Sequence, residues 1–192
     1  RLTLKELKEV TQQEDAVLLD TRNREDFALG FISGSLLSPL NKQFNTVAGS
    51  YITEDEEIYL VVEEHLVEEA VRDLYRIGYD KIEVMYSEQN VGKLEKVDVR
   101  AFDGLEDVDA NSLILDVRKA TEYQEGHIDG AMNIAHTRLL PKLEDVPKEK
   151  KIYVHCQAGG RSAVAAALLQ REGHDVVLID DKFENYRKPQ TA

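Results

Sequence analysis

One stretch of this 192-residue chain holds residue types that covalent chemistry needs, the segment HCQAGGRS at positions 155–162. Cys156 is the only cysteine in the chain, and two glycines, Arg161 and Ser162 follow it closely. A thiolate is a strong nucleophile, and a helix N-terminus or a nearby arginine favours the thiolate over the thiol. The spacing therefore predicts that Cys156 is a catalytic nucleophile in a short anion-binding loop.

Two elements must position this loop. The apolar run IYVH predicts a strand, and SAVAAALLQREG predicts a helix with Ser162 as its N-cap. A loop between a strand and a helix N-terminus points backbone N–H groups into one concavity, which favours anions. The Arg161 guanidinium would match a sulfonate, thiosulfate or phosphate oxygen. The predicted substrate-binding residues are Gln157, Ala158, Gly159, Gly160, Arg161 and Ser162.

The chain repeats itself at long range. LLDTRNREDFALGFISGSLLSPL at 18–40 and ILDVRKATEYQEGHIDGAMNIAH at 114–136 align without a gap. The alignment pairs an acid, an arginine, an aromatic residue and two glycines in each copy, and such a long period is typical of a duplicated domain. We expect two domains, residues 1–90 and 91–192, with the boundary in the polar segment SEQNVGKLEK.

Each half alternates short β-branched runs with helical periodicity. EEIYLVVEEHLVEEAVRDLYRIGYDKIEVM at 56–85 and KKIYVHCQAGGRSAVAAALLQREGHDVVLID at 150–180 both predict strand, helix and strand. Such units require parallel strands joined by crossover helices. The predicted fold class is α/β, with one parallel β-sheet flanked by helices in each half.

The first half lacks the residues of the loop. Val62 aligns with Cys156, and EEHLVEE at 63–69 replaces the glycines and the arginine. Four glutamates at this place oppose the binding of an anion. We expect residues 1–90 to be a catalytically inactive copy that serves as a structural partner or covers the active loop.

The second half resembles the rhodanese (sulfurtransferase) family. Asp116 and Arg118 at a strand end, EYQEGHIDGAMNI at 122–134 and HCQAGGRS match the family's patterns in order. The first half resembles a degenerate copy. The resemblance implies that Cys156 takes a sulfane sulfur from thiosulfate or a persulfide, becomes a persulfide itself, and passes the sulfur to an external thiol or to cyanide. No second cysteine is present to resolve the persulfide within the chain.

Two other functions stay open at this point. Phosphatases and arsenate reductases of a similar fold resemble the pattern His-Cys, five residues, Arg-Ser, whereas four residues separate Cys156 from Arg161 here. The shorter loop favours sulfur transfer in that superfamily. A non-catalytic binding module is disfavoured because Gly159, Gly160 and Arg161 are intact.

Several neighbouring residues have structural interpretations. Asp116 and Arg118 recur as Asp20 and Arg22 in the half without the nucleophile, so we expect them to tie loops together. His155 should point away from the cysteine, because neighbours on a strand face opposite sides. The family's usual Gly-Gly pair and tryptophan after the last strand are replaced by LIDDKFENYRKP, so that wall of the site should differ.

Composition limits the partners. A net charge of −13 disfavours nucleic acid, and no apolar run is long enough for a transmembrane helix. A single cysteine predicts a reducing, cytoplasmic setting. No histidine or cysteine spacing predicts a metal site, so no cofactor is expected in this chain. Rhodanese pairs also occur fused to metallo-β-lactamase-like persulfide dioxygenases, so the resemblance implies such a partner. Any metal would then belong to that absent domain. The chain does not begin with methionine, so we expect it to be a processed form or a fragment.

Overall fold

The computed structural model describes residues 9, 13, 15–86, 94–105 and 108–186. The chain divides into two compact units, Arg1–Lys96 and Val97–Ala192, which are called the first and the second unit below. The predicted boundary between residues 90 and 91 lies outside the described residues. None of the helices in the described part has the length and apolar character that crossing a lipid bilayer demands.

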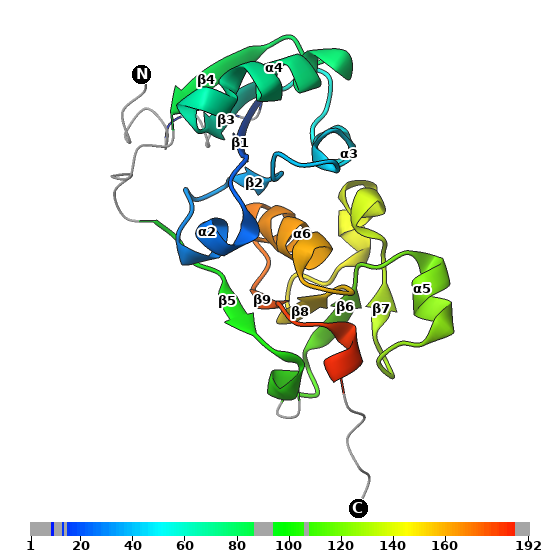
Figure 1. Cartoon of the computed structure of the whole chain (residues 1–192). Helices are drawn as coiled ribbons and strands as arrows, with labels where there is room; N and C mark the ends of the chain where they lie inside the picture. The colour runs from blue at the N-terminus through cyan, green and yellow to red at the C-terminus, as the bar shows by residue number, and fades with distance from the viewer. Residues whose placement is uncertain (1–8, 10–12, 14, 87–93, 106–107, 187–192) are drawn as a thin grey trace, which may run out of the picture. The chain divides into compact units, whose positions relative to one another are not determined.

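The first unit holds a parallel sheet in the order β2-β1-β3-β4 (Figure 1). Its apolar β-branched runs form the strands, and the segments of helical periodicity between them form the crossover helices. In chain order the elements are β1 (Ala16–Asp20), α2 (Arg24–Leu29), β2 (Leu36–Leu37), α3 (Phe44–Tyr51), β3 (Glu57–Val62), the 3₁₀ helix η1 (Glu64–Leu66), α4 (Val67–Arg76) and β4 (Ile82–Tyr86).

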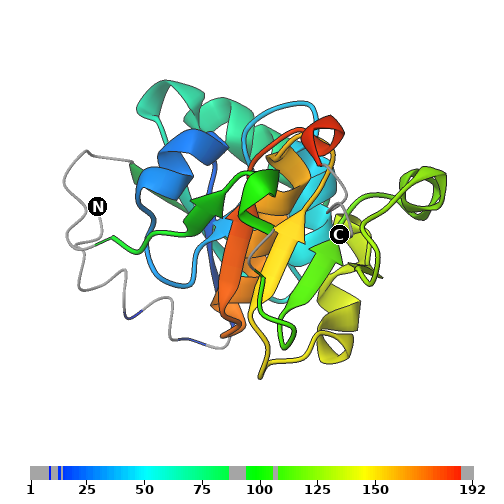
Figure 2. The same ribbon diagram turned by 90° about the horizontal axis from the view of Figure 1, so that it is seen from below.

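The second unit holds a parallel sheet in the order β5-β9-β8-β6-β7. Figure 2 shows β9, β8 and β6 side by side, with the helix α6 across one face. The elements are β5 (Asp98–Arg100), η2 (Phe102–Leu105), β6 (Leu113–Asp116), α5 (Ala120–Glu125), β7 (Met132–Asn133), η3 (His136–Arg138), η4 (Leu140–Asp145), β8 (Ile152–His155), α6 (Gly160–Arg171), β9 (Val176–Ile179) and η5 (Phe183–Asn185). The predicted fold class, α/β with two parallel sheets flanked by helices, is confirmed.

The two sheets share one strand order and one register. Strands β2-β1-β3-β4 correspond to β7-β6-β8-β9. Leu18 pairs with Tyr59 in the first sheet, and Ile114 pairs with Tyr153 in the second, as the repeat in the sequence requires. The register therefore places Val62 at the position that Cys156 occupies in the second unit.

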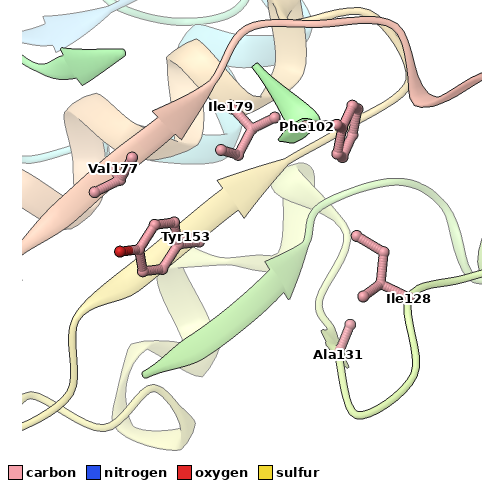
Figure 3. Packing of buried hydrophobic residues seen from close by; sticks show 6 residues of the cluster. All are labelled: Phe102, Ile128, Ala131, Tyr153, Val177 and Ile179. Carbon is pink, nitrogen blue, oxygen red and sulfur yellow. The ribbon is translucent and has the colours of Figure 1, made fainter. Parts of the chain in front are cut away.

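A compact core fixes the face of the second sheet that lies opposite α6. Tyr153 and Val177 lie on adjacent strands, and Figure 3 shows them with side chains from η2 and from the segment after α5. The six buried members are Phe102, Ile128, Ala131, Tyr153, Val177 and Ile179. Because side chains alternate along a strand, Tyr153 and His155 share this face, and Val154 points to the other, on which α6 packs.

Candidate active site

Cys156 lies directly after β8, at the carboxyl end of the second sheet. Its Sγ accepts a hydrogen bond from the Gly159 backbone N–H at 3.2 Å and lies 3.4 Å from the Ser162 hydroxyl. Both groups are donors that stabilise a negatively charged sulfur. Only 1% of Cys156 is exposed, so the residue is buried within the loop. The predicted nucleophile thus sits inside a hydrogen-bonded loop.

Gly159 gives the loop its shape. Its φ is +88°, in the left-handed region that residues with a Cβ rarely adopt. No non-glycine residue in the described part of the chain has a positive φ. This bend turns the Gly159 N–H back toward the sulfur, while Ala158 and Gly160 are exposed at the tip of the loop.

The prediction that Ser162 is the N-cap is wrong. α6 begins at Gly160 with Gly159 as its N-cap, because the bend at Gly159 ends the loop three residues before Ser162. The Ser162 side chain is fully buried, with its hydroxyl 3.0 Å from the Gly159 carbonyl oxygen and 3.3 Å from that of Ile179. One hydroxyl proton serves these acceptors and the sulfur in turn, so Ser162 ties the loop to β9.

Arg161 does not stand free to receive an anion. Its Nη1 and Nη2 donate to Glu122 Oε2 and Oε1 at 2.6 and 2.8 Å, a bidentate pair between α6 and α5. Arg161 lowers the pKa of Glu122 to about 2, and Glu122 in turn raises the pKa of Arg161, to which Cys156 contributes a smaller part. Glu122 is therefore a charged member of the site that sequence reasoning missed, although it stands in the quoted EYQEGHIDGAMNI segment.

Asp116 and Arg118 form a buried ion pair behind the loop. Arg118 Nη2 donates to Asp116 Oδ2 at 2.6 Å and to the Gly126 carbonyl oxygen at 2.8 Å, and Arg118 is only 3% exposed. Arg118 Nη1 also approaches Gln157 Oε1 at 3.4 Å, which links the pair to the loop.

The first unit repeats this arrangement without the loop. Arg22 Nη2 donates to Asp20 Oδ2 at 2.6 Å and to the Gly30 carbonyl oxygen at 2.9 Å. The repeated geometry favours the predicted structural role, because it persists where no nucleophile exists.

The wall of the site that departs from the family pattern is built by Phe183 of η5. Its backbone N–H donates to the Gln157 carbonyl oxygen at 3.0 Å, and its ring lies 3.8 Å from Arg118 Cζ. The ring also stacks on His155, with centroids 5.5 Å apart. The sequence predicts that this wall of the site differs from the family pattern, but it does not point to Phe183. The only signal was that LIDDKFENYRKP stands where the family has a Gly-Gly pair and a tryptophan.

His155 packs against aromatic rings, which agrees with its predicted packing role. It is fully buried between Phe183 and Phe102, whose ring centroid is 5.4 Å away. Burial lowers its pKa, although the Asp116 carboxylate opposes this shift. His127 lies at the surface, stacked on Tyr123 with ring centroids 3.9 Å apart.

His136 is a second residue that the sequence did not single out. It lies at the start of η3, where burial, and then the charges of Arg161 and Lys119, lower its pKa to about 4. It is therefore neutral at pH 7 beside the Arg161–Glu122 pair. Its counterpart in the first unit is Leu40. The Leu40 backbone N–H donates to the Thr21 carbonyl oxygen, and the His136 backbone N–H donates to the equivalent carbonyl oxygen of Val117.

The same position in the first unit has another structure. After Val62 and Glu63 the chain enters η1, and Leu66 N donates to the Glu63 carbonyl oxygen at 2.9 Å. Over the described residues there is no group of three or more histidines, cysteines or carboxylates suited to a metal ion in either unit.

Comparison with known proteins finds similarity that includes the second unit. Residues 97–189 match the family model of the rhodanese-like domain. The chain is 29% identical over 93 residues to the putative sulfur carrier protein YrkF of Bacillus subtilis, a match that covers 48% of this chain and 50% of that protein. It is 29% identical over 66 residues to a sulfurtransferase of Allochromatium vinosum, a match that covers 34% of this chain and 62% of that protein.

A solved structure gives a further match. It is the reduced CoADR-RHD of Bacillus anthracis, which is 35% identical, with 47% of this chain and 16% of that chain covered and a TM-score of 0.43. This chain thus spans about half to three fifths of the two curated relatives named above.

Proposed function

We propose that this chain is a sulfurtransferase that carries sulfane sulfur as a persulfide on Cys156. The observation that carries the proposal is the loop itself: the sulfur lies at a strand end, with the Gly159 N–H at 3.2 Å and the Ser162 hydroxyl at 3.4 Å. Donors so placed stabilise a thiolate before the reaction and the terminal persulfide sulfur after it. The relatives named as sulfur carrier and sulfurtransferase support this choice.

The proposed reaction has two balanced steps. The thiolate attacks the outer sulfur of thiosulfate or of a persulfide; a sulfur–sulfur bond forms at Cys156, and sulfite or a small thiolate leaves with the electron pair of the broken bond. An external thiolate or cyanide then attacks the outer sulfur and leaves the Cys156 thiolate behind. The acceptor must be external, because the sequence contains one cysteine.

Phosphate chemistry is the less favoured alternative. A phosphate group needs uncompensated positive charge in the loop, whereas Arg161 is already neutralised by Glu122 through two short hydrogen bonds.

We further propose a cytoplasmic role without a cofactor in this chain. Its partners would be small sulfur donors and thiol acceptors, with a persulfide dioxygenase as a fused or associated protein.

Mass spectrometry of the intact protein tests the proposal. After incubation with thiosulfate or the persulfide of a small thiol, the chain should gain one sulfur atom, and cyanide should remove it. The matched control is Cys156→Ser, which keeps the hydrogen-bonding shape and should gain nothing. If the unmodified thiol persists with every donor, or Cys156→Ser gains sulfur equally, the proposal is wrong.

A further inference from the structure

The one charged side chain in the loop is already paired. Arg161 is the only charged residue between Gln157 and Ser162, and Glu122 holds it bidentately from a neighbouring helix. The two side chains are 27% and 28% exposed, so water screens the pair only in part. The field that Arg161 would otherwise direct at an incoming anion is therefore largely cancelled.

The other charged groups close to the loop do not supply the positive field that the Arg161–Glu122 pair has lost. Arg118, behind the loop, is matched by Asp116 at 2.6 Å, and His136 is neutral at pH 7 because its pKa is about 4. Lys119 is exposed to solvent, where its charge is screened. Backbone N–H groups at the start of α6 are then the main attraction for an anionic donor, with no uncompensated cationic side chain in the loop to offset a second negative charge.

We infer that Glu122 sets the charge of the sulfur donor, so that persulfides of small thiols are preferred over thiosulfate. Thiosulfate would bring two negative charges next to the Glu122 carboxylate, whereas a persulfide brings one on its outer sulfur. The step written for the persulfide is Cys156–S⁻ + R–S–S⁻ → Cys156–S–S⁻ + R–S⁻, which conserves atoms and charge. This inference rests on the proposed sulfurtransferase function and names its substrate class.

Substitution of Glu122 can remove its charge while keeping its shape. Besides binding Arg161, Oε2 accepts the Lys119 backbone N–H at 3.1 Å at the start of α5. The amide oxygen of Glu122→Gln can still accept that bond, so the helix start is preserved. Glu122→Asp keeps the charge on a shorter side chain, and Glu125→Gln, one turn further along α5 and exposed, removes an equal charge elsewhere.

The first measurement is sulfur transfer with each donor. In Glu122→Gln, kcat/KM for thiosulfate relative to that for a small persulfide should rise about five-fold, the effect of removing one partly screened charge near the sulfur. Glu122→Asp and Glu125→Gln should stay near the wild-type ratio. An unchanged ratio in Glu122→Gln, or an equal rise in Glu125→Gln, would overturn the inference.

The second measurement does not depend on sulfur transfer. Cys156 is the only thiol, so its alkylation by anionic iodoacetate and by neutral iodoacetamide can be followed by mass. Both reagents form a thioether and release iodide, and both must reach the same buried sulfur, so the ratio of their rates reports the charge at the sulfur. The ratio should rise about five-fold in Glu122→Gln and return toward wild type in Glu122→Asp. A constant ratio contradicts the role of Glu122, whereas a changed ratio without any sulfur loading would refute the sulfurtransferase function alone.

Discussion

The loop after β3 and the loop after β8 leave the same place in two sheets of the same strand order. Around them the two units match closely: Arg22 holds Asp20 and the Gly30 carbonyl as Arg118 holds Asp116 and the Gly126 carbonyl. The loops themselves differ, since one is a 3₁₀ turn and the other coils around a sulfur atom. The scaffold is therefore independent of the chemistry, which depends on a few residues after one strand.

The largest effect should come from Gly159→His, which places the first unit's His65 in the second unit's loop. A residue with a Cβ at φ +88° costs about 1–2 kcal/mol, so the loop should relax and withdraw the N–H that bonds the sulfur. We expect the rate of persulfide formation to fall about 100-fold. Mass spectrometry over a time course measures it.

The reverse substitution is the control for that experiment. His65→Gly in the first unit should leave sulfur loading at the wild-type rate. A wild-type rate in Gly159→His would mean that the left-handed bend is not needed for the reaction.

The two ion pairs can be compared directly by stability. Arg118→Ala leaves the buried Asp116 carboxylate without its partner and should lower the free energy of unfolding by about 3 kcal/mol. Arg22→Ala should cost less, about 2 kcal/mol, because 24% of the Arg22 side chain is exposed and water can replace it. Urea unfolding with hydrogen exchange read separately for each unit gives both values.

An exposed arginine supplies the baseline. Arg72→Ala on α4 removes a side chain that is 56% exposed and should change stability by less than about 0.5 kcal/mol. If Arg118→Ala were as mild as Arg72→Ala, the pair would not be holding the loops.

A third difference between the units predicts a pH dependence. His136 has a pKa of about 4 in the folded chain, against an ordinary value of 6.5, so between these pH values the unfolded chain binds more protons. Stability therefore falls as pH falls through this window, by about 2 kcal/mol once partial exposure is allowed for. His136→Leu, which copies Leu40 of the first unit, should remove this part of the slope.

Urea unfolding at pH 7 and at pH 4.5 checks the prediction for His136. Every other titrating group is common to the two proteins, so the difference in slope belongs to His136. Parallel curves for wild type and His136→Leu would show that burial of this imidazole does not disfavour its charged form.

The sequence was sufficient for the sheets but not for the loop. Asp20 and Asp116, with the β-branched runs before them, mark equivalent strand ends because period and composition are local signals. The start of α6 was misplaced because the φ of Gly159 depends on the whole loop. The partner of Arg161 was missed because Glu122 lies 39 positions away in the sequence, and a single sequence does not show which distant residues meet in space.

The smallest expected effect tests whether the cysteine alone separates the two units. Val62→Cys in a Cys156→Ser background puts the only thiol at the equivalent place in the first unit, and we expect no gain of sulfur from thiosulfate or a persulfide. There the chain enters the 3₁₀ turn η1, closed by the bond from the Leu66 N–H to the Glu63 carbonyl oxygen, instead of a loop bent at a glycine with positive φ. Four carboxylates also repel an anionic donor: Glu63, Glu64, Glu68 and Glu69.

Intact-mass measurement decides this case, with alkylation by neutral iodoacetamide as the control that the new thiol is reachable. A thiol that alkylates but never takes sulfur would show that access and nucleophile are insufficient without the glycine bend. Sulfur gained at residue 62 would mean instead that the scaffold supplies enough by itself. In that case the loss of one side chain, rather than of the whole loop, would separate the two units.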